Sequence, residues 1–597
     1  MQLKFKNNFL GYFHFYYSVI GNKLYRFIFI NMLVGLLDGI GLSMFIPLLS
    51  IAFGGKNDNS QSLGKLHYFI DALQKTGISV TVSSVLVLLI VLFSLKGLMR
   101  YFQMQYMAQM RFSFITKIRS ELLNMLGNVK YRDFLQLDSG TIQNSLLSEM
   151  TRLYGTMSNY FWTIQYAVMV LTYIVLAFLA NYRFAFLVIV GAALSNILYK
   201  KIFSNTQKAS IKVSQKGNQF NSFLVQAINH FRYLKATDYF RKYAARLNEV
   251  IKETEDMNLK IGRYQALSEG TKEPIAVAII CIVVYIQFYF FKGNMNSVFV
   301  SLLLFYRSLT QLSQLQSSRQ SFIQNIGSMY AISNMAESLQ AMQEDTTIGK
   351  PVANIGTIRL ENVSLTYDSA PVLENISMKV EKNTTIAFIG ESGSGKTSLA
   401  HLMIGLFPPT KGNVFIDNQN LQNINIHAYR NKIGYISQDA VIFNDTIFNN
   451  VTFFDTPLEA NIQRFWKALQ LASLSDFVQS LPLQEHTVLG DNGMLISGGQ
   501  KQRISIAREL YKECELLILD EATSALDSET ENIIRENIEQ LQGKYTIIVI
   551  AHRLSTVKKA DTIYLLKNKK ITASGSFEEL LTASDEFKKI INAQAFQ

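Results

Sequence analysis

The clearest candidate for chemistry is a glycine-rich segment that follows a mostly apolar run, Thr385–Ile389. A strand, a loop of the pattern G-x-x-x-x-G-K-[ST] and a helix form the context in which backbone N–H groups surround phosphate oxygens. The N-terminus of the following helix adds positive potential. The segment is therefore predicted to bind nucleotide phosphates through Gly390, Glu391, Ser392, Gly393, Ser394, Gly395, Lys396, Thr397 and Ser398.

Carboxylates at the end of a second apolar run complete the expected chemistry. Lys396 is predicted to bridge the β- and γ-phosphates of ATP, and the Thr397 hydroxyl to hold Mg²⁺. The run Leu516–Leu519 ends in Asp520 and Glu521, and α/β sheets bind ligands at the C-terminal ends of their strands. Asp520 suits the Mg²⁺ shell, whereas Glu521 is placed to orient or deprotonate the attacking water. The two motifs together predict an ATP-hydrolysing site.

The segment that begins at Ile496, ISGGQKQRISIAR, lies between these motifs. It resembles the signature of the ATP-binding cassette (ABC) family, which reads Leu-Ser-Gly-Gly-Gln before a helix. Ile496 departs from that pattern conservatively. In this family ATP lies between the phosphate loop of one cassette and the signature of another. The resemblance therefore implies that Ser497, Gly498, Gly499 and Gln500 contact a nucleotide held by a second subunit.

Four further residues occur in the family's order and take their expected roles from the same resemblance. Tyr367 is expected to stack on adenine, and Gln438 to link Mg²⁺ to the membrane interface. Asp527, in Ser-Ala-Leu-Asp, is expected to contact the opposite subunit. His552 follows the apolar run Thr546–Ile550 and is expected to contact the γ-phosphate. Each alone could be an ordinary packing or surface residue, but their order favours the family.

Three segments resemble the parts that couple cassettes to membrane helices in exporters of this family. Thr487–Gly493 resembles the short segment that touches the cytoplasmic helices, with Asp491 where the pattern commonly has Glu. Tyr131–Phe134 resembles the first helix tip and Tyr233–Phe240 the second. For any single residue of these tips, an ordinary helix turn remains the alternative.

The rest of the chain must position this site, and its composition indicates a membrane. The chain has 597 residues, of which 49% are hydrophobic and 17% charged, against about 25% charged in soluble domains. Two distant cysteines argue against a disulfide framework or a metal–sulfur site. The net charge of +12 fits Lys and Arg retained on the cytoplasmic side of a membrane. No groove-reading motif accompanies it, so no nucleic-acid partner is expected.

The predicted fold is a six-span α-helical exporter-type membrane domain with long cytoplasmic helix extensions, followed by an α/β P-loop ATPase cassette. Residues 1–340 form the membrane domain, 341–355 a linker and 356–597 the cassette. A span needs about 20 apolar residues. The candidates are 27–53, 80–99, 161–180, 184–202, 274–291 and 298–314.

Basic residues orient these spans. Met1–Ile20 is rich in aromatics and reads as an interfacial helix rather than a signal peptide. Lysines and arginines precede the first span, so the N-terminus and the cassette are expected in the cytoplasm of a bacterium, at its cytoplasmic (inner) membrane. Outside, Gly54–Ser79 forms either a short amphipathic helix or a packed hairpin.

One phosphate loop and one signature imply a partner, expected to be a second copy of the chain in a homodimer that binds ATP and Mg²⁺. The part of the first span from Gly35 to Pro47, together with the external segment and Arg307, loosely resembles bacterial flippases of lipid-linked oligosaccharides and related polysaccharide exporters. An amphipathic or lipid-linked substrate is therefore expected. Export of other lipids, drugs or peptides stays open, as does a cassette-regulated channel, while the fused spans argue against an importer.

Two charges, Asp38 and Arg307, fall near mid-membrane when residues are counted along their spans. A central charge costs at least about 2.5–3.5 kcal/mol, so neither is expected to face lipid. Either the two residues pair and lock the first span to the sixth, or Arg307 faces the translocation cavity and binds an anionic group of the substrate.

Overall fold

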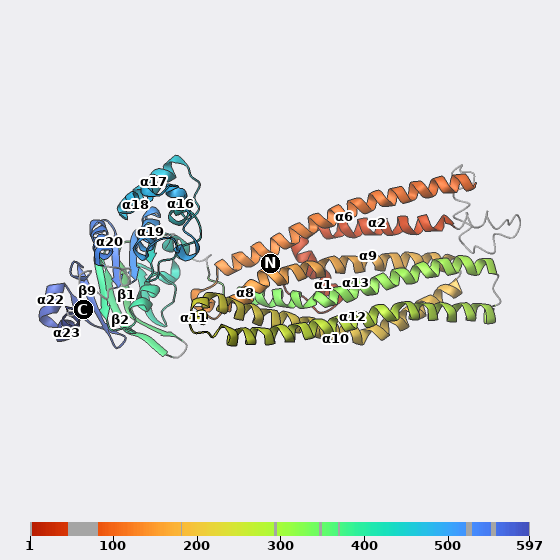
Figure 1. Ribbon diagram of the computed structural model, residues 1–597, viewed down its shortest axis with the longest axis horizontal. Helices are drawn as coiled ribbons and strands as arrows, with labels where there is room; N and C mark the ends of the chain where they lie inside the picture. Colours follow the sequence, from red (N-terminus) through yellow and green to blue (C-terminus); the bar gives the residue numbers. More distant parts are fainter. Residues whose placement is uncertain are drawn as a thin grey trace. The chain divides into compact units, whose positions relative to one another are not determined.

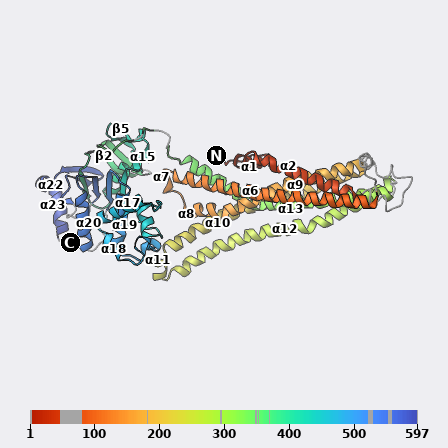
Figure 2. The same cartoon turned by 90° about the horizontal axis from the view of Figure 1, so that it is seen from above.

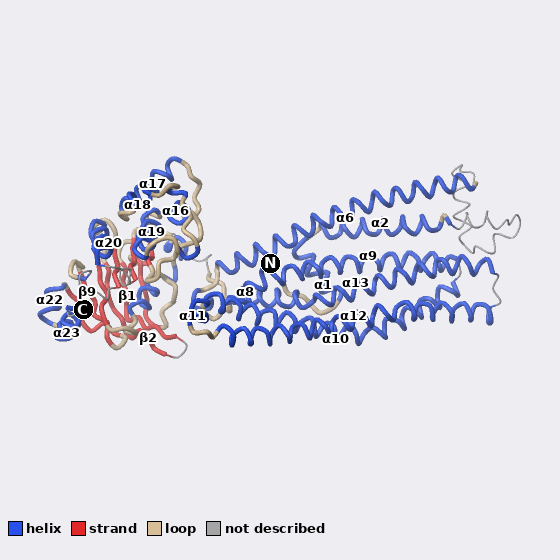
Figure 3. The backbone as a smooth tube through the Cα atoms, in the orientation of Figure 1, coloured by secondary structure: helices blue, strands red, loops and turns tan. Residues whose placement is uncertain are grey.

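The computed structural model describes residues 3–45, 81–180, 182–291, 295–345, 349–350, 352–367, 370–520, 528–550 and 557–595. The external segment Gly54–Ser79 lies outside these residues. The chain divides into two compact units, one helical and one of mixed α/β structure (Figure 3). The first contains Met1–Val129 and Asp133–Gln343, and the second contains Lys130–Arg132 and Glu344–Gln597.

Long helices dominate the first unit (Figure 1). In chain order the helices are α1 (Phe9–Ile20), α2 (Lys23–Ser43), α6 (Val82–Gly127), α7 (Tyr131–Phe134, partly in the second unit), α8 (Ser139–Asn144), the π-helical turn η2 (Ser145–Glu149), α9 (Met150–Ala180), α10 (Tyr182–Asn229), α11 (Phe231–Ala236), α12 (Phe240–Phe291) and α13 (Met295–Ala341).

Four of these helices are far longer than a bilayer requires. Helices α6, α10, α12 and α13 have 46, 48, 52 and 47 residues, against the roughly 20 needed to cross hydrocarbon. Their remaining turns extend beyond the apolar segments. Within the described residues, three stretches are long and apolar enough to cross a membrane: Lys23–Gly41, Val82–Gly127 and Ser139–Leu179. The other three predicted spans fall inside α10, α12 and α13.

Helix α1 contributes to the core of this unit. Its Phe15 and Tyr16 are fully buried, and the Tyr16 hydroxyl donates to Thr156 Oγ1 at 2.9 Å. Phe9 and Leu10, on the same helix, are exposed. The aromatic N-terminus was expected to lie at headgroup level; in the structure Phe15 and Tyr16 pack against Phe114 of α6, and Tyr16 also packs against Tyr160 of α9. Helices α9 and α13 run side by side, as do α10 and α12 (Figures 1 and 2).

Asp38 has a different partner from the one considered from sequence. It is buried, forms an ion pair with Lys96 of α6 and accepts a hydrogen bond of 2.7 Å from the Tyr173 hydroxyl of α9. Arg307 lies near enough to Tyr173 for an electrostatic interaction, yet it makes no ion pair within the described part of the chain. The alternative in which Asp38 and Arg307 pair with each other is therefore wrong.

Two sheets form the frame of the second unit (Figure 3). The antiparallel sheet has the order β2-β1-β4-β5, and the larger sheet has the order β10-β9-β3-β8-β7-β6. The strands are β1 (Ile358–Tyr367), β2 (Ala370–Val380), β3 (Thr385–Gly390), β4 (Lys411–Ile416), β5 (Gln419–Asn420), β6 (Ile433–Ile436), β7 (Leu516–Asp520), β8 (Thr546–Ile550), β9 (Thr562–Lys567) and β10 (Lys570–Gly575).

Helices pack around these sheets (Figure 1). They are α14 (Lys396–Met403), α15 (Ile426–Arg430), α16 (Ile447–Thr452), α17 (Glu459–Leu471), α18 (Ser475–Ser480), α19 (Gly498–Tyr511), α20 (Ser528–Leu541), α22 (Phe577–Ala583) and α23 (Asp585–Ala595). The central strands β7 and β8 are buried along their whole length, which explains why they read as unbroken apolar runs. Strands β3, β8 and β7 are parallel, so their C-terminal ends meet at one edge.

Candidate nucleotide-binding site

The phosphate loop leaves β3 through backbone conformations that favour glycine. Gly393 and Gly395 have φ values of +79° and +103°, in the left-handed region. A Cβ atom added at Gly390 would lie 2.1 Å from the carbonyl oxygen of Leu566, because β9 passes directly beside it. Glycine is therefore needed both for the turn and for the close approach of the neighbouring strand.

Lys396 begins α14 and folds back over the loop. Its Nζ donates to the carbonyl oxygens of Gly390 at 2.8 Å and Glu391 at 3.0 Å. The side chain is 5% exposed. These bonds hold the ammonium group at the centre of the loop, where a phosphate group would meet it.

Two residues expected to hold Mg²⁺ are in contact. The Thr397 hydroxyl donates to Asp520 Oδ1 at 3.2 Å, although 123 residues separate them in the sequence. The sheet register explains the contact, since Asp520 and Phe388 both pair with Ile550 of the intervening strand β8. The end of β7 is thereby level with the beginning of the phosphate loop.

Two residues not considered from sequence support Asp520. The Tyr435 hydroxyl donates to Asp520 Oδ2 at 3.1 Å, and His401 Nε2 lies 3.3 Å from that hydroxyl. Burial, together with the Asp520 carboxylate, raises the pKa of Tyr435, so its hydroxyl stays protonated as a donor. Burial lowers the pKa of His401, although Asp520 acts in the opposite direction. No local motif marks either residue; Tyr435 is recognisable only from its place on β6, next to β7.

These groups fit a magnesium nucleotide. A hydroxyl and a carboxylate oxygen in contact are the donor types that Mg²⁺ prefers. The Ser394 hydroxyl is buried and makes no hydrogen bond to the described residues, so it can bond to a phosphate oxygen. When bound, Mg²⁺ would neutralise negative charge of the phosphates. Thr397 and Asp520 would hold it.

Tyr367 belongs to an aromatic cluster at the end of β1. Its ring centroid lies 4.9 Å from that of Phe407, and its hydroxyl hydrogen-bonds with Ser398 at the beginning of α14. The ring centroid of Tyr131 lies 5.5 Å from that of Phe407, and the His401 ring is 6.1 Å from each of these two rings. The first predicted helix tip therefore contributes a ring to the cluster that positions Tyr367.

The signature segment forms the N-terminus of α19. Ser497 and Gln500 form a capping box, with the Ser497 N–H donating to Gln500 Oε1 at 2.9 Å and the Gln500 N–H donating to Ser497 Oγ at 3.3 Å. A Cβ atom added at Gly498 would meet no described atom within 4 Å. Because α14 packs on β2 and β3 whereas α19 packs on α16 and α17, the phosphate loop and the signature are held by different elements.

The structure describes only some of the other predicted site residues. Gln438 lies exposed after β6, and Asp491 accepts a hydrogen bond of 2.6 Å from Asn444 Nδ2. Glu521, Asp527 and His552 lie outside the described residues. Their roles stay predictions.

The comparisons with known proteins agree with this geometry. Residues 27–313 match the model of the ABC transporter transmembrane region, and residues 373–524 match that of the ABC transporter. The chain also resembles the solved structure of a bacterial Atm1-family ABC exporter with ATP bound. The TM-score is 0.81 at 21% identity, over 97% of this chain and all of the other.

Bacterial relatives are similar either along most of the chain or over the cassette-sized part of it. The heterocyst differentiation ATP-binding protein HepA of Nostoc sp. is 28% identical over 503 residues, which are 82% of this chain and 80% of that protein. The ATP-dependent lipid A-core flippase of Syntrophus aciditrophicus is 27% identical over 85% of this chain and 84% of its own. That of Burkholderia orbicola is 45% identical over 236 residues, 39% of each chain.

The chain belongs to the ABC transporter family. It is an exporter-type half-transporter, with one transmembrane region followed by one cassette. It couples the hydrolysis of ATP, with Mg²⁺, to transport across a membrane.

Proposed function

We propose that two copies of this chain form an exporter that moves a lipid-linked oligosaccharide, or a related polyprenyl- or glycolipid, across the bacterial cytoplasmic membrane. The observation that carries this proposal is the charge balance around Asp38. Its carboxylate is already matched by Lys96, and Arg307 nearby has no acidic partner among the described residues.

An unmatched cation inside the membrane is expensive. A central arginine costs at least about 2.5–3.5 kcal/mol on insertion scales, so a chain that retains one has a use for it. A guanidinium offers a planar fork of donors that matches phosphate oxygens. Arg307 is half-buried, so part of it is open to a ligand. A pyrophosphate between a lipid and a sugar is an anion of this kind.

The names of the relatives support a lipid cargo. Several proteins that align with most of this chain are named ATP-dependent lipid A-core flippase. From these relatives we infer the class of substrate, which is an amphiphile with an anionic headgroup, rather than one particular lipid.

The proposed nucleotide cycle uses the residues that the sequence predicts for the cassette. Lys396 and the phosphate loop hold the phosphates, while Thr397 and Asp520 hold Mg²⁺. Glu521 activates the attacking water and His552 contacts the γ-phosphate. Ser497 of the second copy completes each site, so ATP closes the two cassettes and hydrolysis allows them to part. With the cassettes in the cytoplasm, the substrate enters from the cytoplasmic leaflet.

Reconstitution with a lipid-linked oligosaccharide tests this function. We expect ATP to make the headgroup accessible from the other leaflet in wild-type proteoliposomes. Arg307→Gln should keep basal ATPase and assembly but abolish this movement. Arg119→Gln, a control that removes an exposed arginine of α6, should transport normally.

Three outcomes would contradict the proposal. Full transport by Arg307→Gln would remove its substrate role. Movement of cationic drugs or peptides, but not of the lipid, would assign the chain to another class of exporter. ATP-dependent ion conductance without substrate-stimulated hydrolysis would indicate a channel.

A further inference from the structure

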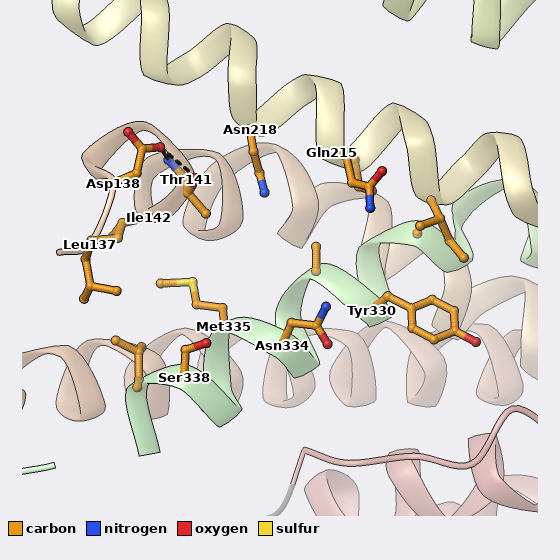
Figure 4. A pocket seen from close by; sticks show the side chains of 15 residues that line it. Leu137, Asp138, Thr141, Ile142, Gln215, Asn218, Tyr330, Asn334, Met335 and Ser338 are labelled. Atoms are coloured by element: carbon orange, nitrogen blue, oxygen red, sulfur yellow. Dashed lines mark hydrogen bonds between the residues drawn. The ribbon is translucent and has the colours of Figure 1, made fainter. Parts of the chain in front are cut away.

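A cavity of about 390 Å³ lies between α12 and α13. Its volume falls in the range of about 300–1,000 Å³ that is typical of small-molecule sites. A second cavity, of about 220 Å³, lies between α8, α10 and α13. Gln215, Asn218 and Asn334 line this smaller cavity together with apolar residues such as Leu137 and Met335 (Figure 4), and its volume is below that range. The larger cavity is the stronger candidate for a ligand.

Polarity changes along the larger cavity. One end is lined by Lys272, Glu273 and Gln314, and the other by Ile280 and Leu309. Leu309 is buried against Ile280 and its neighbours, and Tyr306 also lines this end, so the second end is mostly apolar. Eight residues of helix separate Lys272 from Ile280, which corresponds to about 12 Å. The cavity therefore has the length and polarity of a headgroup followed by the first part of an acyl chain.

The direction of the two helices indicates which end of the cavity faces the cytoplasm. Along α13, Gln314 is nearer than Leu309 to Ala341, after which the chain continues into the linker and the cassette. Gln314 is also the last residue of the sixth predicted span, and Glu273 directly precedes the fifth. The polar end thus lies at the cytoplasmic boundary, with the apolar end deeper in the membrane, as in a lipid of the cytoplasmic leaflet.

Lys272 is already compensated within the protein. Its buried ammonium donates to Glu269 Oε1 at 2.6 Å and to Ser317 Oγ. Burial alone would raise the pKa of Glu269, but the hydrogen bonds from Lys272 and Ser317 outweigh it and lower the pKa. Glu269 is therefore ionised and neutralises Lys272.

Glu273 is the charge that remains. It is exposed at the polar end of the cavity, and it has no cationic partner within the described part of the chain. The amide of Gln314 lines the same end. A free carboxylate beside an amide favours a headgroup that carries an ammonium group, and disfavours one that is only anionic.

We propose that the cavity between α12 and α13 binds one lipid of the cytoplasmic leaflet with an amine-bearing headgroup. The headgroup ammonium meets Glu273, and one acyl chain lies along Ile280 and Leu309. This lipid is distinct from the cargo proposed for Arg307, and its binding requires neither ATP nor transport.

Lipid retention on the purified full-length protein tests the site. Native mass spectrometry in detergent would compare dioleoyl phosphatidylethanolamine with dioleoyl phosphatidylglycerol, which have the same chains. We expect the wild-type chain to retain the ethanolamine lipid about fivefold better. Glu273→Gln should remove this preference and Glu273→Asp should keep most of it. Ile280→Trp, which fills the apolar end, should reduce retention of both lipids.

Glu249→Gln is the matched control, because it removes an exposed carboxylate of the same helix outside the cavity. It should retain lipids like the wild type, and an unchanged melting temperature would show that each variant is folded. An equal preference in wild type and Glu273→Gln would overturn the proposal. So would binding of dodecyltrimethylammonium with no retention of phosphatidylethanolamine, since the occupant would then be a soluble cation. Failure of the export proposal would leave these results unaffected.

Discussion

At the scale of single residues, the nucleotide site depends on carboxylates whose neighbours fix their orientation. Asp520 is held by two donors, the hydroxyls of Thr397 and Tyr435. If Mg²⁺ takes the place of the Thr397 contact, Tyr435 is the remaining donor among the described residues that keeps the carboxylate in position. Groups behind a metal ligand of this kind commonly change metal affinity by about 10–100-fold.

Tyr435→Phe should therefore raise the Mg²⁺ concentration for half-maximal ATPase by about tenfold. The ring is kept, so packing and maximal turnover at saturating Mg²⁺ should change little. Titration of ATPase with Mg²⁺ measures this, and Tyr545→Phe, a half-buried tyrosine elsewhere in the cassette, is the control. An unchanged Mg²⁺ requirement would limit Tyr435 to a packing role.

Glu521→Gln should preserve ATP binding and lower hydrolysis by about 10²-fold or more, because the amide cannot accept a proton from water. ATPase rates and nucleotide affinity of the purified variant are the measurements. Glu536→Gln changes an exposed carboxylate of α20 in the same way and should be active. Near-normal turnover by Glu521→Gln would assign the general base to another group.

At the scale of elements, buried polar contacts join the long helices where they leave the apolar spans. Arg152 of α9 pairs with the buried Glu149 at 3.2 Å and donates to Ser214 Oγ of α10 at 2.7 Å. Ser210 of α10 donates to the Gln324 carbonyl of α13 at 2.7 Å. Because these polar side chains find hydrogen-bond partners on other helices, the network fixes the relative register of three helices.

Asp138 is the N-cap of α8 and links it to α10. It accepts bonds from the Thr141 N–H at 2.8 Å and from the Ser222 hydroxyl at 2.8 Å. Burial acts to raise the pKa of Asp138, but these hydrogen bonds outweigh it and lower the pKa below its ordinary value of 3.8. The folded state therefore favours the ionised form.

Asp138→Ala should destabilise the helical unit by about 1 kcal/mol at pH 7, the usual cost of losing an N-cap. A lowered folded-state pKa gives stability that is complete above the unfolded pKa and is lost as pH falls through the folded pKa. The difference in melting temperature between wild type and variant should thus be constant from pH 8 to 5 and shrink below about pH 4. A difference that grows on acidification would contradict this assignment.

At the scale of the whole molecule, the chain carries one phosphate loop and one signature, held by different elements of a single cassette. In the proposed homodimer the nucleotide of the second cassette would contact α19 near Gly498, where an added Cβ atom would meet no described atom within 4 Å. The proposed homodimer would contain two equivalent sites, each built from both copies.

Ser497→Arg should block ATP-driven closure of the two cassettes but spare ATP binding to the phosphate loop, because a bulky cation would occupy the space of the γ-phosphate. Crosslinking across the cassette interface, with and without ATP, measures closure. Lys501→Arg, one helical turn further along α19, is the control and should close normally. ATP-dependent crosslinks in Ser497→Arg would remove the composite site.

The sequence by itself determined the features that depend on neighbouring residues. The phosphate loop from Gly390 to Thr397 is recognisable because its glycines, lysine and hydroxyl act within one strand–loop–helix unit. Long apolar runs likewise indicated spanning helices, and the buried strand ending at Asp520 was evident from four apolar residues in a row. Family resemblance added the signature at Ser497 and its dependence on a second cassette.

Only the tertiary structure decided which side chains meet. Counting residues placed Asp38 and Arg307 at similar depth, because helical rise is fixed at about 1.5 Å per residue. Depth does not specify the rotation of a helix or its neighbours. Packing places Asp38 in contact with Lys96 and Tyr173, which lie 58 and 135 residues away in the sequence. It leaves Arg307 without an acidic partner among the described residues. The parallel order of β6, β7 and β8 brought Tyr435 to Asp520 for the same reason. Such contacts depend on how separate helices and strands pack, which no local sequence pattern indicates.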